Sequence, residues 1–340
     1  MPIYSYSQAH EDVILFRALK DVGIGHYVDV GAGDPALHSV TLLFYERGWR
    51  GVNIEPLPEQ YQHLLAHRPH DVNLCAAAGS KQSEITLYRT RGNLELSTSD
   101  PVNAARAASV GCQVDEISVQ SVTLNDVLDS VALHEVHFLK IDVEGSEAAV
   151  LQGLDLSRHR PWIIVVEAHA PMSRTETHGE WEPMLLAAAY DFVFYDGLNR
   201  YYLRQESQAL QSRFYGPANP FDDYIDFWTL GDPLTNPAHP DRDWVRGQLA
   251  NLHKAAGLGA STDLQRYMAR LPEGEGAMEL NLERLAAVYR AVLDRDADPA
   301  GVTFFLEDPQ RAFSVEEAYR LLIDSHEYSA KRVRSLRQLV

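Results

Sequence analysis

The stretch Val28-Asp29-Val30-Gly31-Ala32-Gly33-Asp34 decides the fold prediction, because it reads as a β-strand that runs into a turn with two glycines. Gly31 and Gly33 let the backbone bend sharply and approach a ligand closely, since they carry no Cβ. A dinucleotide-binding turn needs a third glycine and a helix that begins at once, but Asp34 and Pro35 follow here. An acidic residue at this place repels a pyrophosphate and suits a cation. The turn therefore disfavours a nicotinamide-dependent dehydrogenase.

Short β-rich apolar runs alternate with helical patterns around this turn. The runs 136–141 and 162–167 are almost continuously hydrophobic, as expected of parallel strands that are covered on both faces. The sequence therefore predicts an α/β fold with a mostly parallel sheet. A helix is expected over 8–20, with Ser7 able to cap its first turn. Further sheet strands are predicted at 27–30, 52–54, 72–75 and 191–195, and antiparallel edge strands or an added hairpin at 84–88, 118–122, 201–203 and 224–228.

Length and charge limit the architecture and the partners. The chain has 340 residues, which is about twice a typical domain length, so two units are expected. The net charge of −18 argues against nucleic acid and anionic membrane surfaces as partners. The two cysteines, Cys75 and Cys112, make neither a disulfide framework nor a zinc cluster. Neither an export signal nor a membrane-spanning apolar run is visible. A cytoplasmic protein without membrane insertion is expected.

A proline-rich stretch marks the expected domain boundary. Residues 230–240 contain three prolines, strand patterns end there, and helical patterns follow. We expect an α/β domain over 1–230, a linker with helices over 231–275, and an all-α accessory domain over 276–340.

Two acidic residues frame the glycine turn. Asp29 precedes the glycines, and Glu55 ends the next predicted strand 26 residues later. In such an arrangement one acid supports the turn and the other accepts both ribose hydroxyls of an adenosine moiety. These features resemble class I S-adenosylmethionine-dependent methyltransferases, whose cofactor carries a sulfonium, an amino group and a ribose. An ordinary α/β turn is the alternative interpretation.

Five ordered motifs make the resemblance more specific. Over about residues 4–228 the chain resembles the FkbM-type methyltransferase family. The resemblance implies a Rossmann-like class I fold with a seven-stranded sheet, S-adenosylmethionine as cofactor, and methylation of hydroxyl oxygens on bacterial surface sugars or polyketides. One departure is Val40, where the family usually has Asn. The motifs are Ser7-Gln8 with Glu11-Asp12, the turn at 27–33, Ser39-Val40-Thr41 with 48–56, the run 139–147, and 165–167.

The resemblance also implies a set of cofactor contacts. It places the glycine turn at the methionine part of the cofactor and Glu55 on its ribose, with Gln8 and Ser39 at the amino acid end. For Glu11 and Asp12, a solvated and capped first helical turn is as well supported as ligand contact. The candidate cofactor-binding residues are Gln8, Asp29, Gly31, Gly33, Ser39, Glu55 and Asp142.

Two predicted strands end in polar side chains where an acceptor should bind. Asp142 and Glu144 follow the strand at 136–141, and Glu167 and His169 follow the next one. In doubly wound sheets, ligands bind at these carboxyl ends. Methyl transfer to an alcohol needs a base or a metal that removes or masks the hydroxyl proton. One hypothesis makes His169 the general base, held by Asp142 or Glu144.

The other hypothesis assigns Asp142, Glu167 and His169 to a Mg²⁺ or Mn²⁺ ion, because oxygen-rich ligand sets favour these ions. Its layout resembles catechol-type O-methyltransferases, although there the two ligands on the second strand are adjacent and here Ala168 separates them. A turn-capping Glu144 and a solvated His169 are the simpler alternatives. The candidate acceptor contacts are His38, which is also another candidate base, and Asn199 and Arg200 in a predicted hairpin turn.

The C-terminal part resembles, over residues 281–329, a small helical module of unknown function found in many bacterial proteins, some of them glycan enzymes. Asp294, Asp296 and Asp298 imitate the start of a calcium loop, but Pro299 stands where that loop needs glycine. A solvated interhelical turn is therefore predicted. We expect this tail to dock a second subunit, giving a homo-oligomer, or a polymeric acceptor.

The predicted function is a bacterial O-methyltransferase that transfers a methyl group from S-adenosylmethionine to a sugar hydroxyl of a surface glycan or its precursor. Methylation of a polyketide or another small-molecule hydroxyl is the alternative within the same fold. A glycan-binding protein that kept the fold and lost catalysis is the alternative from a different class.

Overall fold

A computed structural model describes residues 3–131, 133 and 135–228, together with scattered positions between 280 and 322. The chain divides into two compact units, Met1–Phe227 and Trp228–Val340. The proline-rich stretch and the linker expected over 231–275 lie outside the described residues.

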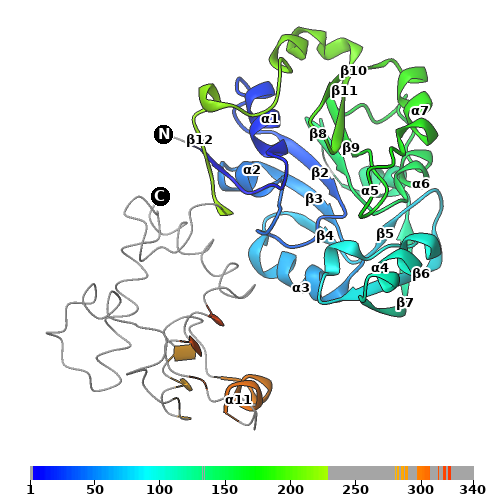
Figure 1. The fold of residues 1–340 in the computed structure, drawn as a ribbon. Helices are drawn as coiled ribbons and strands as arrows, with labels where there is room; N and C mark the ends of the chain where they lie inside the picture. The colour runs from blue at the N-terminus through cyan, green and yellow to red at the C-terminus, as the bar shows by residue number, and fades with distance from the viewer. Residues whose placement is uncertain are drawn as a thin grey trace, which may run out of the picture. The chain divides into compact units, whose positions relative to one another are not determined.

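The first unit is built around a seven-stranded sheet with the order β10-β11-β9-β8-β2-β3-β4 (Figure 1). The sheet is mixed: β11 runs antiparallel to both of its neighbours, and the other strands run parallel to one another. The expectation of a mostly parallel sheet is confirmed. Its strands are β2 (His26–Val30), β3 (Arg50–Ile54), β4 (Val72–Leu74), β8 (Phe138–Ile141), β9 (Ile163–Glu167), β10 (Tyr190–Tyr195) and β11 (Asn199–Arg204).

For 201–203 the edge alternative is wrong, whereas the hairpin alternative is confirmed, because β10 and β11 pair antiparallel across a short turn. β11 lies between β9 and β10 and pairs with both. Its residues Tyr201, Tyr202 and Leu203 are all buried, so this strand needs neighbours on both sides. The edge position belongs to β10.

Two smaller sheets accompany the main one. β6 (Ser83–Arg91) and β7 (Gln113–Val122), which contain two of the segments expected at edges or in an added hairpin, pair antiparallel outside the main sheet, and β5 (Ala77–Ala78) joins β7. The chain ends of the first unit meet where β1 (Ile3–Ser5) pairs in parallel with β12 (Tyr224–Asp226).

Helices connect these strands. The helix expected over 8–20 is shorter, because His10 in a left-handed conformation (φ 59°) precedes its first residue. The Ser7 hydroxyl donates to Asp12 Oδ1 at 2.7 Å and accepts a hydrogen bond from the Asp12 amide at 3.3 Å, so it caps the first turn as expected. The helices are α1 (Glu11–Ala18), α2 (Leu42–Glu46), α3 (Pro58–His67), α4 (Pro101–Ser109), α5 (Leu124–Ser130), α6 (Glu147–Gln152) and α7 (Glu182–Ala187), with 3-10 turns η1 (Leu94–Leu96), η2 (His178–Glu180), η3 (Gln205–Arg213) and η4 (Pro220–Asp222).

Side chains alternate between the two faces of the main sheet. An aliphatic cluster fills one face and includes residues of α5, α6 and α7. On the other face Tyr27 of β2 stacks on Phe138 of β8, with ring centroids 5.6 Å apart. Two residues further along each strand, the same parallel register places Asp29 of β2 opposite Lys140 of β8. The register therefore places two charged side chains together on the aromatic face.

The described part of the second unit contains α11 (Pro299–Leu306). The Gly301 amide donates to Asp298 Oδ1 at 2.7 Å, so this aspartate supports the first turn of the helix. Asp294 and Asp296 of the imitated calcium loop lie outside the described residues, as do most of the helices predicted for the tail. Among the described residues, no helix is both long enough and apolar enough to cross a membrane.

The glycine turn allows a matched stability test. Gly31 and Gly33 both have positive φ, but a Cβ at Gly31 would overlap the Asp142 carbonyl oxygen, whereas a Cβ at Gly33 would meet nothing within 4 Å. Gly33→Ala is expected to lower the free energy of unfolding by about 1 kcal/mol, because alanine must adopt the left-handed conformation there. Gly31→Ala adds overpacking and is expected to cost roughly 3 kcal/mol. Urea unfolding of both variants checks this; equal losses would contradict it.

Candidate active site

A cavity of about 440 Å³ opens at the carboxyl ends of β2, β3, β8 and β9. This volume lies in the range of small-molecule sites, roughly 300–1,000 Å³. Its walls come from the glycine turn, from the residues that follow these strands, and from the segment 93–99 beside the three-stranded sheet. The carboxyl edge of a doubly wound sheet is where ligands bind.

Glu55 supports the glycine turn. Its Oε2 accepts a hydrogen bond from the Gly33 amide at 2.8 Å, and its Oε1 accepts one from the Leu57 amide at 2.8 Å. Burial raises the pKa of Glu55 to about 7. The supporting role that the sequence suggested for Asp29 therefore belongs to Glu55, which also lines the cavity.

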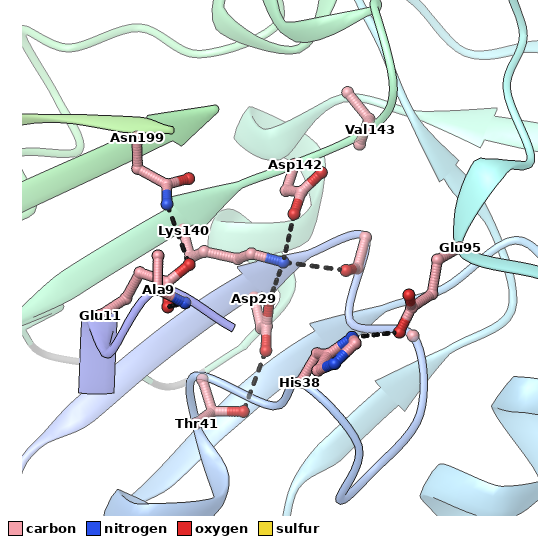
Figure 2. A network of polar contacts seen from close by, with 12 residues as sticks. Ala9, Glu11, Asp29, His38, Thr41, Glu95, Lys140, Asp142, Val143 and Asn199 are labelled. Atoms are coloured by element: carbon pink, nitrogen blue, oxygen red, sulfur yellow. Dashed lines mark hydrogen bonds and ion pairs between the residues drawn. The ribbon is translucent and has the colours of Figure 1, made fainter. Parts of the chain in front are cut away.

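Asp29 lies beneath the cavity in a network around Lys140 (Figure 2). Asp29 is 1% exposed, accepts a hydrogen bond from Thr41 Oγ1 at 2.9 Å, and lies 3.7 Å from Lys140 Nζ. Lys140 Nζ also donates to the Gly31 carbonyl at 3.2 Å and pairs with Asp142 at 3.3 Å. Burial alone would lower the pKa of Lys140, but Asp142 and Asp29 outweigh burial and raise it. Lys140 thus joins β2, the glycine turn and the end of β8.

Sequence reasoning did not single out Lys140. The signal was a lone lysine inside the apolar run 136–141. A charge in a strand that is covered on both faces must be paired, but the sequence does not reveal which strand supplies the partner.

Three carboxylates gather beside this network. Asp142, Glu144 and Glu167 place one oxygen each within 4.8 Å of one another. Burial, followed by the charge of Asp142, raises the pKa of Glu144 to about 9 and that of Glu167 to about 11. One buried oxygen in each of these two glutamates has no hydrogen-bond partner. We call Asp142, Glu144 and Glu167 the carboxylate trio.

Glu147 serves the turn that follows β8. Its Oε1 accepts hydrogen bonds from the Val143 amide at 3.2 Å and the Gly145 amide at 3.0 Å. Gly145 has a φ of 102°, which favours glycine. Of the two glutamates in this motif, Glu147 therefore caps the turn, whereas the carboxylate of Glu144 belongs to the trio.

His169 lines the cavity but has other partners than the sequence suggested. Its Nδ1 lies 3.3 Å from the Leu198 carbonyl, and its Nε2 lies 3.1 Å from the Tyr195 hydroxyl. Its partners are thus neither Asp142 nor Glu144. The structure brings Glu144, rather than His169, to Asp142 and Glu167.

Gln8 and His38 also line the cavity. His38 Nδ1 lies 2.8 Å from Glu95 Oε1 in a contact that joins the loop after the glycine turn to η1 (Figure 2). The hydrogen bond to Glu95 raises the pKa of His38. This contact connects two walls of the cavity.

Four predicted contacts lie outside the cavity lining: Asp29, Ser39, Asn199 and Arg200. Arg68 donates to Ser39 Oγ at 2.9 Å. Arg200 pairs with Glu182 at 2.9 Å. Each of these polar groups is engaged within the fold.

Glu11 and Asp12 do not form a solvated helical turn, since they are 5% and 0% exposed. Asn199 donates to Glu11 Oε1 at 2.9 Å across 188 residues of chain. Asp12 accepts a hydrogen bond from the Tyr6 amide at 2.7 Å. Burial and then the charge of Asp196 raise the pKa of Glu11 to about 7.

The fold and the cavity together define an α/β protein with a ligand site at the carboxyl edge of its central strands. Residues 29–193 match the family model described as the methyltransferase FkbM domain. This match supports the resemblance to FkbM-type methyltransferases that the motifs predict. The matched range includes the glycine turn, Glu55 and the carboxylate trio. No curated protein matches the chain.

The buried pair of Lys140 should matter for stability. Removing one partner of a buried ion pair typically costs about 3–5 kcal/mol, because the other charge stays buried. Lys140→Met is expected to lose about this much of the free energy of unfolding at pH 8. Lys81→Met, which changes an exposed lysine, should lose less than about 0.5 kcal/mol. Similar unfolding curves for the two variants would contradict the role of Lys140.

Glu11 should make stability depend on pH. Its pKa is about 7 in the folded protein and ordinarily 4.5, so the folded state holds the extra proton between these values. Its contribution to the free energy of unfolding therefore falls as the pH rises from about 4.5 to 7, by roughly 3 kcal/mol. In Glu11→Gln the free energy of unfolding should fall less between pH 5 and pH 8 than it does in the wild type. Urea unfolding at both pH values tests this, and identical losses would disprove it.

Proposed function

We propose that this methyltransferase uses S-adenosylmethionine, bound in the cavity, to methylate a hydroxyl oxygen on a sugar of a bacterial surface glycan or its precursor. One observation carries the proposal. The cavity brings the glycine turn, Glu55 and the carboxylate trio to one edge of the sheet. A ligand with a ribose at one end and a positive charge near the other suits this arrangement.

The ribose is proposed to bind at Glu55. Each oxygen of this carboxylate accepts one backbone amide and keeps acceptor capacity for a hydroxyl. The open space at Gly33 lets a ligand approach the turn. Gln8 can bind the amino acid end of the cofactor, and the trio favours the sulfonium electrostatically.

Methyl transfer also requires removal of the proton from the acceptor hydroxyl. When bound, the cofactor supplies the methyl group from its sulfonium. His169 is proposed as the base that takes the hydroxyl proton as the oxygen attacks. The Leu198 carbonyl, 3.3 Å from Nδ1, fixes its ring, and the acceptor hydroxyl takes the place of the Tyr195 hydroxyl at Nε2.

The charge of the cavity supports a neutral acceptor. Lys140 is the one lysine or arginine among the described lining residues, and its ammonium is engaged by Asp29, Asp142 and the Gly31 carbonyl. Among the described lining residues, no side chain offers a free cation to a phosphorylated acceptor. The carboxylates can instead accept hydrogen bonds from the hydroxyls of a neutral sugar. The helical tail is proposed to dock a polymeric acceptor or a second subunit.

Glu55 provides the test of cofactor binding. Glu55→Gln should weaken S-adenosylmethionine binding by tenfold or more in calorimetry, because an amide accepts fewer ribose hydrogen bonds than a carboxylate. Glu59→Gln makes the same charge change outside the cavity lining and should bind like the wild type. Unchanged affinity in Glu55→Gln would overturn the proposed cofactor site.

Transfer of a labelled methyl group tests the acceptor. The enzyme is incubated with methyl-labelled S-adenosylmethionine and fractionated bacterial extract, and label is expected in glycan that linkage analysis identifies as an O-methyl sugar. Label found only in small lipophilic molecules would overturn the sugar assignment and favour the polyketide alternative. Cofactor binding without any transfer would favour a non-catalytic glycan-binding protein.

A further inference from the structure

We infer that Asp142, Glu144 and Glu167 form a binding site for a divalent cation of the Mg²⁺ and Mn²⁺ class. Carboxylate oxygens are the ligands that these ions prefer. Opposite oxygens around an octahedral Mg²⁺ ion lie about 4.2 Å apart. The trio's oxygens lie within 4.8 Å of one another, so small side-chain shifts bring them to one ion.

A second observation points to a ligand at this place. The side chain of Glu167 faces the cavity, is only 8% exposed, and leaves its Oε2 without a hydrogen-bond partner. A buried carboxylate oxygen without a partner is costly unless a cation or a proton satisfies it. Glu55 and Glu147 differ, because backbone amides already occupy their carboxylates.

The balance of charge leads to the same conclusion. The trio carries up to three negative charges, and the nearest positive group is Lys140, whose Nζ lies 3.3 Å from Asp142. Lys140 is shared with Asp29 and the Gly31 carbonyl. Because the described cavity lining offers no other lysine or arginine, no further side-chain cation competes with a divalent ion for the trio.

The ion's role rests on the proposed function. An acceptor hydroxyl bound to the cation has a lowered pKa. The hydroxyl proton passes to His169 or to water, the oxygen forms a bond to the methyl carbon, and the carbon–sulfur bond breaks with its electron pair left on sulfur. The cation is not consumed and no oxidant is required.

Binding of Mn²⁺ to the full-length protein without cofactor tests the site. Electron paramagnetic resonance measures the loss of the free Mn²⁺ signal. The wild type is expected to bind, and Asp142→Asn and Glu167→Gln should weaken binding at least tenfold. Glu95→Gln removes a carboxylate of the same cavity outside the trio and should stay within about twofold of the wild type. Circular dichroism and thermal melting establish that each variant is folded.

Each outcome decides the proposal. Absent Mn²⁺ binding in the wild type, or equal binding in folded trio variants and the wild type, overturns the site. Because this measurement needs neither cofactor nor acceptor, a protein that binds Mn²⁺ through the trio but transfers no methyl group retains the cation site and loses the proposed function. Methyl transfer by a protein that does not bind Mn²⁺ would overturn the cation site and leave the proposed function intact.

Discussion

The parallel register of β2 and β8 is the constraint on which the site depends. It places Asp29 opposite Lys140 on the same face of the sheet, where both side chains are buried. Taking two charges out of water is costly unless they are paired and hydrogen-bonded. Thr41 donates a hydrogen bond to Asp29 Oδ2, while the Gly31 carbonyl and Asp142 complete the contacts of Lys140. One ammonium thus fixes both the glycine turn and the first carboxylate beyond β8.

Part of the chain's excess of acidic residues is concentrated at the cavity. Carboxylates approach the cavity from the ends of three strands of the main sheet, β3, β8 and β9. Some are engaged by backbone amides, as Glu55 is, and hold the turns in shape. Others, such as Glu144 and Glu167, keep an oxygen without a partner. The first group builds the cavity, and the second leaves it able to bind a positively charged ligand.

Local patterns in the sequence predicted the strands and the glycine turn, and placed Glu55 at the end of a strand, because each depends on residues close together in the chain. The partners of Lys140, Glu11 and His169 could not be predicted, because they come from strands and loops distant in sequence. Asn199, for example, reaches Glu11 across 188 residues. β11 was misassigned as an edge strand for the same reason. Ser39 matched a motif, but the position of its hydroxyl depends on Arg68 of a later loop.

The central claim is that the cavity at the strand ends holds the methyl donor. A crystal structure of the full chain with S-adenosylhomocysteine tests it most directly. The account predicts the ribose hydroxyls within hydrogen-bond distance of Glu55 and the sulfur beside the carboxylates of Asp142, Glu144 and Glu167. A ligand bound elsewhere, or bound here with its adenosine directed away from Glu55, would contradict it.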